Sequence, residues 1–271
     1  MIVHVLGSGS RGNAVLIEAG GTRVLVDAGF SPRGMAARLQ FAEVLPESIA
    51  AVIVTHEHID HVNGVVRCAT RWGWRIFASA GTRTGCASLA KASVETVSTR
   101  GTFTIGQLDL TTLAVSHDAN EPIAIIATSR ETGAKTAIVY DLGVFTETLL
   151  RAIRGVDILM IEANHDVAML RNGPYPPGVQ RRIASRYGHL SNDDAARVAR
   201  QCAHKGLSHV VLAHLSQKNN RPRIAIETVR AALEGTAFRG QVTAAAQGRV
   251  TGPFVPNGES YRAPIQLQLA I

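Results

Sequence analysis

The sequence is poor in cysteine and in aromatic residues. Its three cysteines, Cys68, Cys86 and Cys202, are far apart and form no Cys-x-x-Cys pair, which argues against a disulfide framework or a thiolate zinc site. We expect them to serve as small hydrophobic residues. Aromatic residues make up only 5% of the chain, and the aromatic pattern of an RNA-recognition motif is missing. The sequence therefore shows no obvious reader of nucleic-acid bases.

The chain also has no apolar stretch near the length of about 18 residues that a membrane span needs. Residues 1–13 lack the basic and long apolar segments of a signal peptide, so we expect a cytoplasmic protein with no membrane partner. With 271 residues, of which 46% are hydrophobic, the chain can bury a substantial core, and we expect one domain over residues 1–271. The formal net charge of +7 is consistent with an anionic partner.

Short apolar runs alternate with helical patterns along the chain. The runs that predict strands are 1–6, 14–19, 23–28, 50–55, 75–79, 108–115, 123–129, 135–141, 157–163 and 209–214. The helical patterns are 33–45, 65–72, 82–91, 146–154, 192–205 and 222–234. Turns at 20–21 and 131–133 predict antiparallel pairs, and we expect a loop at 171–178. This interleaving predicts a layered α/β sandwich.

The segment GSGSRG at 7–12 matches the glycine pattern of a dinucleotide-binding motif, but its context does not. That motif needs a helix to begin at its third glycine, whereas residues 13–27 continue as a strand, a turn and a strand. We therefore expect no Rossmann site. Two interpretations stay open: Ser8, Ser10 and Asn13 hold a phosphate at the edge of a sheet, or the glycines serve only a tight turn.

The densest group of ionisable residues is THEHIDH at 55–61, directly after an apolar run. His56 and His58 are two positions apart and cannot share one helix face, so a loop must hold them. A buried cluster of this kind is costly unless it is paired or bound to metal. Other apolar runs also end in potential ligands or proton carriers: Asp27, His117, Asp141, Glu162 and His214. Strand ends on one edge of a sheet converge, so these residues predict a single crevice.

These residues resemble the signature of the metallo-β-lactamase superfamily. THEHIDH is similar to its central motif, and Asp27, His117, Asp141 and His214 fall in the order and rough spacing of its other motifs. The segments GSGSRGN, DAGFS, IEANHDVAML, GPYP, GHLSN and AHLSQKNN resemble those of the YycJ/WalJ-type family. The resemblance covers residues 1–220. It implies an α/β fold, a four-layer αββα sandwich in which two mixed sheets are flanked by helices, with a dinuclear metal site on one edge.

The resemblance also implies which residues bind the two ions. It assigns His56, His58 and His117 to the first ion, Asp60, His61 and His214 to the second, and Asp141 to a bridging position. Asp27 would support the histidine loop through hydrogen bonds. Imidazole and carboxylate ligands fit zinc, which we expect, although the preferences of manganese and iron overlap with it.

A dinuclear site of this kind is suited to hydrolysis. The oxygen ligand Asp141, where many lactamases carry cysteine, implies by analogy the phosphodiesterase and glyoxalase branches. The tRNase Z branch is similar at Glu162 and His189, where Glu162 would orient and charge His189 as general acid. With the ligand Asp60, these two form the expected catalytic set. The alternative is that His189 is a loop residue next to the helix that Ser191 caps.

Several residues are candidate substrate contacts. Guanidinium groups suit phosphate oxygens, and the alternative is a solvated basic face. The arginines concerned are Arg171, Arg181, Arg182 and Arg186 in one loop-rich segment, and Arg221 and Arg223 after the HLSQKNN loop. The remaining candidates are Ser8, Ser10, Asn13, Asn219, Asn220 and His165, of which His165 has an equally plausible structural role in the turn at 162–170. We expect no inserted β-CASP domain and no flexible arm that grips tRNA.

The expected function is that of a dinuclear phosphodiesterase or nuclease with DNA as the favoured nucleic-acid substrate, which the resemblance extends to 5′-to-3′ exonuclease action. One alternative is a small-molecule phosphodiesterase or thioesterase. Another is a non-catalytic regulatory module that binds nucleic acid or a protein partner. The complete set of ligands argues against an idle site.

Overall fold

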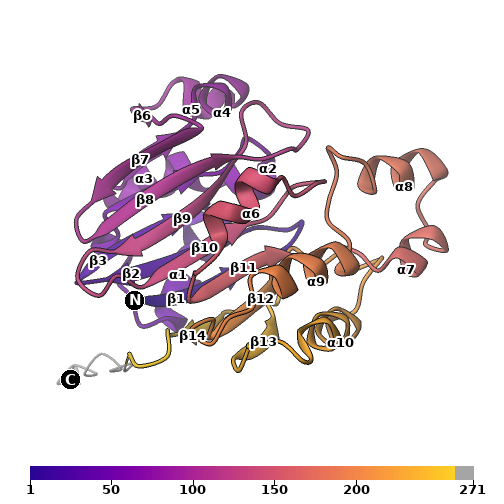
Figure 1. Cartoon of the computed structure of the whole chain (residues 1–271). Helices are drawn as coiled ribbons and strands as arrows, with labels where there is room; N and C mark the ends of the chain where they lie inside the picture. Colours follow the sequence, from indigo (N-terminus) through magenta and orange to yellow (C-terminus); the bar gives the residue numbers. More distant parts are fainter. Residues whose placement is uncertain (260–271) are drawn as a thin grey trace, which may run out of the picture.

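The structure, a computed structural model that describes residues 1–259, is built around two seven-stranded β-sheets that pack face to face (Figure 1). The strand order is β14-β1-β2-β3-β4-β5-β6 in the first sheet and β13-β12-β11-β10-β9-β8-β7 in the second. The first sheet consists of β1 (Ile2–Gly7), β2 (Ala14–Ala19), β3 (Thr22–Val26), β4 (Ala51–Val54), β5 (Arg75–Ala78), β6 (Val94–Thr96) and β14 (Thr251–Phe254). The second consists of β7 (Arg100–Ile105), β8 (Leu108–Ala114), β9 (Ile123–Ser129), β10 (Lys135–Val139), β11 (Ile158–Glu162), β12 (His209–Ala213) and β13 (Gln241–Ala244).

Each sheet is mixed, with an antiparallel part followed by a parallel part. In the first sheet β1, β2 and β3 pair antiparallel, and β3 to β6 pair parallel. In the second, β7 to β10 pair antiparallel and β10 to β13 pair parallel. The predicted tight turns at 20–21 and 131–133 join β2 to β3 and β9 to β10. Parallel neighbours need a longer connection, and each of these connections contains at least one helix.

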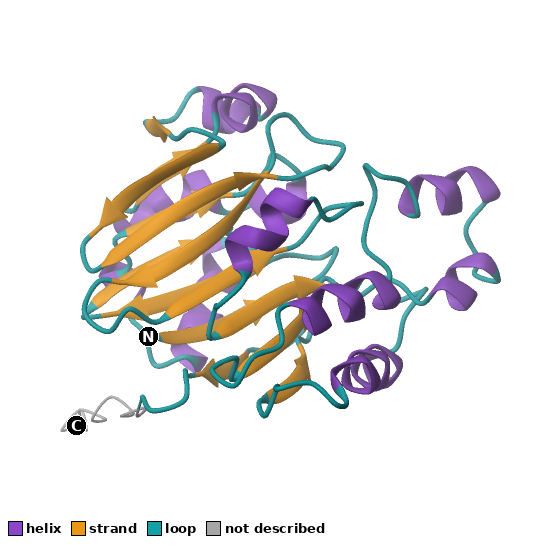
Figure 2. Ribbon diagram, in the orientation of Figure 1, coloured by secondary structure: helices purple, strands orange, loops and turns teal. Residues whose placement is uncertain are grey.

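Helices cover the outer faces of both sheets (Figure 2). The helices that precede the second sheet are α1 (Pro32–Phe41), η1 (Pro46–Ser48), α2 (Ile59–Val62), α3 (Val65–Trp72), α4 (Ala80–Gly85) and α5 (Ala87–Ala90). Those within and after it are α6 (Glu147–Ile153), α7 (Val167–Arg171), α8 (Pro177–Ile183), α9 (Asn192–Gln201) and α10 (Pro222–Leu233). Within residues 1–259, no helix is long and apolar enough to cross a membrane.

Three apolar clusters hold these layers together. One lies between the sheets, one between the first sheet and helices α1 and α3, and one between the second sheet and helices α6, α9 and α10. Strand β3 contributes to two of these clusters. Val24 and Val26 belong to the cluster between the sheets, whereas Leu25 belongs to the cluster between the first sheet and helices α1 and α3. Successive side chains of a strand point to opposite faces, so an uninterrupted apolar strand serves both clusters. The predicted αββα sandwich is confirmed.

The cysteines behave as predicted from their spacing. Cys68 belongs to the cluster under α1 and α3, and Cys202 to the cluster under α9. Cys86 is half-buried against the cluster under α1 and α3. All three cysteines are free of disulfide bonds within residues 1–259.

Some elements differ from those expected. The helix predicted at 82–91 is divided at Cys86, which has an extended backbone. The 171–178 loop ends at Pro177, where α8 begins, a position that favours proline. Helices α7 and α8 project from the body beside the site (Figure 1). Helix α8 contains no buried residue, so it leaves no apolar periodicity in the sequence.

Candidate active site

The site is built on the ends of strands from both sheets. His56 follows β4, Glu162 ends β11, and Asp27, Asp141 and His214 lie just beyond β3, β10 and β12. The last three have φ angles of 62°, 54° and 52°, a left-handed conformation that is uncommon for residues other than glycine and concentrates at functional sites. The chain therefore turns sharply where each of these side chains enters the crevice.

His56, His58 and His117 form one group of candidate ligands, with their ligand atoms within 4.8 Å of one another. His117 donates its Nδ1 proton to the Gly188 carbonyl at 3.1 Å, which leaves Nε2 as an acceptor 3.3 Å from Nδ1 of His58. The buried Nε2 of His56 has no hydrogen-bond partner among residues 1–259. Burial lowers the pKa of His56 and His117, so both stay neutral, as metal ligation requires.

Asp60, His61 and His214 form a second group with the same spacing. Asp60 and His61 lie on the short helix α2. His61 donates its Nδ1 proton to Asp27 at 2.6 Å, so Nε2 is left to face Asp60 Oδ2 at 3.5 Å. Nε2 of His214 is 3.4 Å from the same oxygen. Burial would raise the pKa of Asp60, but hydrogen bonds from His214 and His61 hold it well below its usual range.

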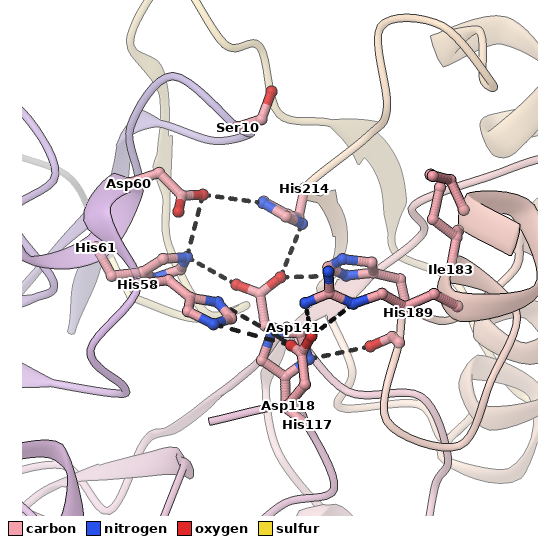
Figure 3. A pocket seen from close by; sticks show the side chains of 13 residues that line it. Ser10, His58, Asp60, His61, His117, Asp118, Asp141, Ile183, His189 and His214 are labelled. Atoms are coloured by element: carbon pink, nitrogen blue, oxygen red, sulfur yellow. Dashed lines mark hydrogen bonds and ion pairs between the residues drawn. The ribbon is translucent and has the colours of Figure 1, made fainter. Parts of the chain in front are cut away.

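Asp141 lies between the two groups (Figure 3). Its Oδ2 is 2.8 Å from His61 Nε2 and 3.9 Å from His56 Nε2, and its Oδ1 is 2.9 Å from His214 Nδ1. Both oxygens are buried and lack a hydrogen bond of acceptable geometry. A buried carboxylate without such partners is costly unless it binds a cation. Together with the unpaired Nε2 of His56, this shows that the residues fit two bridged divalent ions.

Asp27 lies beneath the second group and holds it in place. Its carboxylate accepts hydrogen bonds from Thr55 N and Thr55 Oγ1, both at 2.8 Å, from Tyr140 Oη at 2.7 Å, and from His61. The predicted hydrogen-bonding position of Asp27 is therefore present. Thr55 and Tyr140 were not predicted. Each directly precedes a candidate ligand in the sequence, His56 or Asp141, and that adjacency is the signal that would have found them.

Two residues of the 7–13 loop form hydrogen bonds with the site. Ser8 and Asn13 are 2% and 1% exposed, so neither offers a surface to substrate. Ser8 Oγ accepts the His214 backbone N–H at 2.8 Å, and the Asn13 amide donates to Asp60 Oδ2 at 3.1 Å. Ser10 alone of the three is exposed and lines the crevice. The tight-turn interpretation fits this loop, because Gly9 and Gly12 have φ angles of 135° and 147° and the Gly12 N–H donates to Gly9 O at 2.9 Å.

His189 and Glu162 form the pair predicted from the sequence. His189 donates its Nδ1 proton to Glu162 Oε1 at 2.7 Å, while Glu162 Oε2 accepts the backbone N–H groups of Leu142 and Leu190. The capping box at Ser191 fixes the helix that follows. Burial disfavours the charged imidazole, but Glu162 and Asp141 outweigh it and raise the pKa of His189 to about 9. The imidazole therefore carries a proton at neutral pH.

Glu162 and His189 also lie close enough to Asp141 and His214 to be metal ligands by distance alone. The Glu162 oxygens, however, already accept the His189 Nδ1 proton and two backbone protons. We therefore assign Glu162 to hydrogen bonding. The acid role of His189 stays a prediction.

A cavity of about 300 Å³ gives access to these groups. Helix α8 contributes Val179, Arg182 and Ile183 to its wall, and Arg182 forms an ion pair with Asp118. Asp118, which was not predicted, lies 3.3 Å from His117 Nε2. The other lining residues are Ser10, His58, Asp60, His61, His117, Asp141, Gly188, His189 and His214. Arg181 is exposed on α8 and does not line the cavity.

Three other candidate contacts are buried away from the cavity. His165 is 3% exposed, and its carbonyl accepts the Asn192 N–H at 2.8 Å, which favours the structural interpretation of the 162–170 turn. Asn220 is 2% exposed and bonds to Ala163 O and Asn192. Asn219 is fully buried. These residues shape the loops and do not meet the solvent.

Comparison with known proteins gives concordant matches. The family described as "Beta-lactamase superfamily domain" matches residues 22–215. The chain is 33% identical over 239 residues to the exodeoxyribonuclease YycJ of Bacillus anthracis, covering 86% of this chain and 89% of that protein. It is 32% identical over 231 residues to the exodeoxyribonuclease WalJ of Streptococcus pneumoniae serotype 2, covering 83% of this chain and 85% of that protein.

Solved structures agree on the fold. The metallo-β-lactamase fold protein YhfI from Bacillus subtilis superposes with a TM-score of 0.68 at 19% identity, covering 92% of this chain and 98% of that chain. The short form of human tRNase Z superposes with a TM-score of 0.63 at 20% identity, covering 94% of this chain and 100% of that chain. At these identities the likeness concerns the fold alone.

Proposed function

Because the chain belongs to the metallo-β-lactamase superfamily of metal-dependent hydrolases and is a homologue of YycJ and WalJ, we propose that it is a DNA exonuclease that works from the 5′ end. The observation that carries the proposal is the hydrogen-bonded pair of His189 and Glu162 beside the two ligand groups. The two ligand groups that Asp141 bridges account for the metals, and His189 with Glu162 is left for a leaving group. Phosphodiester hydrolysis needs both parts.

The residues divide the work as follows. Two divalent ions, with zinc as our proposal, lower the pKa of water and neutralise charge on a phosphoryl oxygen when bound. His56, His58 and His117 would hold one ion, Asp60, His61 and His214 the other, and Asp141 both. His189 donates a proton from Nε2 to the departing oxygen, because Nδ1 is held by Glu162. Arg182 on α8 lies at the cavity wall, where it can meet a phosphate.

A small phosphodiester is the second candidate substrate, because the cavity of about 300 Å³ lies at the lower end of the usual range for ligand pockets. A non-catalytic role has no such support. The single domain over residues 1–271, of which 260–271 lie outside the described residues, and the cytoplasmic location stay predictions.

The test uses metal-loaded protein with 5′-labelled and 3′-labelled DNA and RNA, single-stranded and double-stranded, beside bis-p-nitrophenyl phosphate and a thioester. We expect mononucleotides from DNA, with the 5′ label released first. Asp141→Asn serves as the inactive control. Release of the 3′ label first would overturn the polarity, and turnover of the thioester alone would overturn the proposal.

A further inference from the structure

A second cavity, of about 280 Å³, adjoins the first at the proton donor. Ser10, Ile183, His189 and His214 line both cavities, and Figure 3 shows His214, His189 and Ile183 across the first cavity from His58 and His61. The two cavities therefore form one groove that passes His189. The other residues that line the second cavity are Asn164, Tyr175, Leu215, Ser216, Gln217 and Lys218.

The two cavities have opposite chemistry. The first is lined by Asp60, Asp118 and Asp141 and suits cations, whereas no carboxylate from the described part of the chain lines the second. Lys218 is exposed there and forms no ion pair with any residue in 1–259. Half-buried Tyr175 adds the only aromatic ring among the residues that line the cavity, apart from the two histidines. A free ammonium group and a phenol ring are the chemistry that binds a phosphate and a base.

The walls of the second cavity are held in fixed positions. The Ser216 N–H donates to Asn164 O at 2.8 Å, and Ser216 Oγ accepts the N–H groups of Lys218 and Asn219. On the other side, the Tyr175 carbonyl accepts Gln180 Nε2 at 2.8 Å, which ties the α7–α8 connection to α8. The site is thus preformed by the 215–219 loop and the projecting helices.

We propose that the second cavity is a terminal-nucleotide pocket, which binds the 5′-phosphorylated end nucleotide of the substrate. Lys218 binds the terminal phosphate and Tyr175 stacks on the base. This inference rests on the proposed exonuclease function. The pocket has room for one nucleotide unit and lies next to His189, so the bond that is cleaved is the one on the 3′ side of that unit.

The hydrolysis then balances in a simple way. The bond between phosphorus and the 3′ oxygen of the terminal nucleotide breaks, and that oxygen takes a proton from His189 Nε2. The next nucleotide keeps its phosphate and gains the oxygen of water, whose proton restores the acid through solvent. The products are a nucleoside 5′-monophosphate and a DNA chain that again carries a 5′-phosphate, which is the substrate for the next round.

The direct test is binding of nucleoside 5′-monophosphates, measured by calorimetry without turnover. We expect dAMP and dTMP to bind with similar affinity, because stacking is tolerant of base identity, and deoxyadenosine to bind at least tenfold more weakly. Lys218→Ala and Tyr175→Ala should each weaken dAMP binding about tenfold, whereas Tyr175→Phe keeps it. Lys205→Ala, at the exposed turn that precedes β12 at its opposite end, is the matched control.

A second measurement separates this inference from the proposed function. With 5′-phosphorylated DNA, Lys218→Ala should raise KM about tenfold, and the difference in KM between 5′-phosphorylated and 5′-hydroxyl DNA should disappear. Equal dAMP affinity in the wild type, Lys218→Ala and Tyr175→Ala, in a protein that degrades DNA, overturns the pocket. Variant-sensitive dAMP binding in a protein that degrades no DNA supports the pocket and overturns the exonuclease function.

Discussion

At the scale of single residues, three of the site histidines share one arrangement. His61, His117 and His189 each donate Nδ1–H to a protein oxygen, from Asp27, Gly188 and Glu162 respectively. This fixes the orientation of each ring and turns its Nε2 toward the cavity. For His61 and His117 the free nitrogen faces other candidate ligands, and for His189 it is left for a proton. The difference in role follows from what surrounds Nε2.

His189→Ala should keep both ions and the fold but lose about 10²–10⁴ in turnover of a nucleotide ester, the usual contribution of a positioned acid. The loss should shrink for bis-p-nitrophenyl phosphate, because nitrophenolate departs without a proton. Glu162→Gln should show a weaker form of the same pattern, since it loosens the acid and removes its charge partner. Steady-state kinetics on both esters, with elemental analysis, measure this. Equal losses on both esters, or a missing ion, would contradict an acid role.

Asp60→Asn should leave about one ion per chain and little turnover, because the second group loses its only carboxylate outside the bridge. Elemental analysis of the purified variant measures the ion content. Asp109→Asn, at the half-exposed start of β8, is the control and should keep two ions. Retention of two ions by Asp60→Asn would remove Asp60 from the ligand set.

The sequence points to these side chains because their chemistry is local. The spacing in THEHIDH and the polar ends of apolar runs are visible without a structure. The partners are harder, because Tyr140 and Asp118 reach the site through contacts between distant elements. Ser8 and Asn13 lie on the predicted loop, but they are buried and hydrogen-bond to the ligand residues His214 and Asp60. The sequence therefore predicts which segments lie near the site, but not which of their side chains face substrate and which contact the ligands.

At the scale of elements, α8 is attached to the body mainly by polar contacts. It contains no buried residue. It is fixed by the ion pair between Arg182 and Asp118, and the segment after it by Ser116 Oγ, which donates to Arg186 O at 2.8 Å. Such a helix has no apolar face, so the sequence shows no helical periodicity there. Strand β7 was not predicted for a similar reason, because its residues are mostly exposed or half-buried. Elements that fill the core were predictable, and those that serve the surface were not.

Reversal of the charges at Arg181 and Arg182 should weaken DNA binding and make its salt dependence shallower. The plot of log K against log salt has a negative slope. For each phosphate that the variant no longer neutralises, the magnitude of this slope should decrease by roughly one unit. Binding titrations over a range of salt concentrations give this slope. The reversal Arg130→Glu, in the turn between β9 and β10, should leave it unchanged. An affinity that does not depend on salt would instead indicate a small substrate.

At the scale of the whole molecule, the packing of the two sheets creates the site. Strands β3 and β4 of the first sheet and β10, β11 and β12 of the second end at the same edge. The dense apolar cluster between the sheets holds these ends in register. It also supports the left-handed backbone at Asp27, Asp141 and His214, which costs free energy in isolation. Stability in the core therefore compensates for strain and charge at the edge.

Metal removal should lower the melting temperature, because an ion that binds only the folded chain stabilises it. An ion at 100 times its Kd contributes about 2.7 kcal/mol, which for a chain of this size shifts Tm by roughly 5–10 °C per site. Differential scanning fluorimetry with and without chelator measures the shift. Asp60→Asn should retain about half of it. An unchanged Tm after chelation would show that these groups bind no ion tightly.

Metal binding should also release protons and tighten as pH rises. Burial opposes the charged form of His61 and His214, but the carboxylates around them, Asp141 above all for His214 and Asp27 for His61, raise the pKa of both well above the ordinary value. In the metal-free protein both rings are therefore protonated at neutral pH, and each must lose a proton before it can bind an ion. Protons compete with the ion for these two rings. Below the raised pKa values of His61 and His214, metal affinity should therefore increase as pH increases. Calorimetry of metal binding in buffers with different heats of ionisation counts the protons released. We expect more than one proton per chain at neutral pH and fewer in the variant His214→Ala, and release of no protons would contradict ligation by these two histidines.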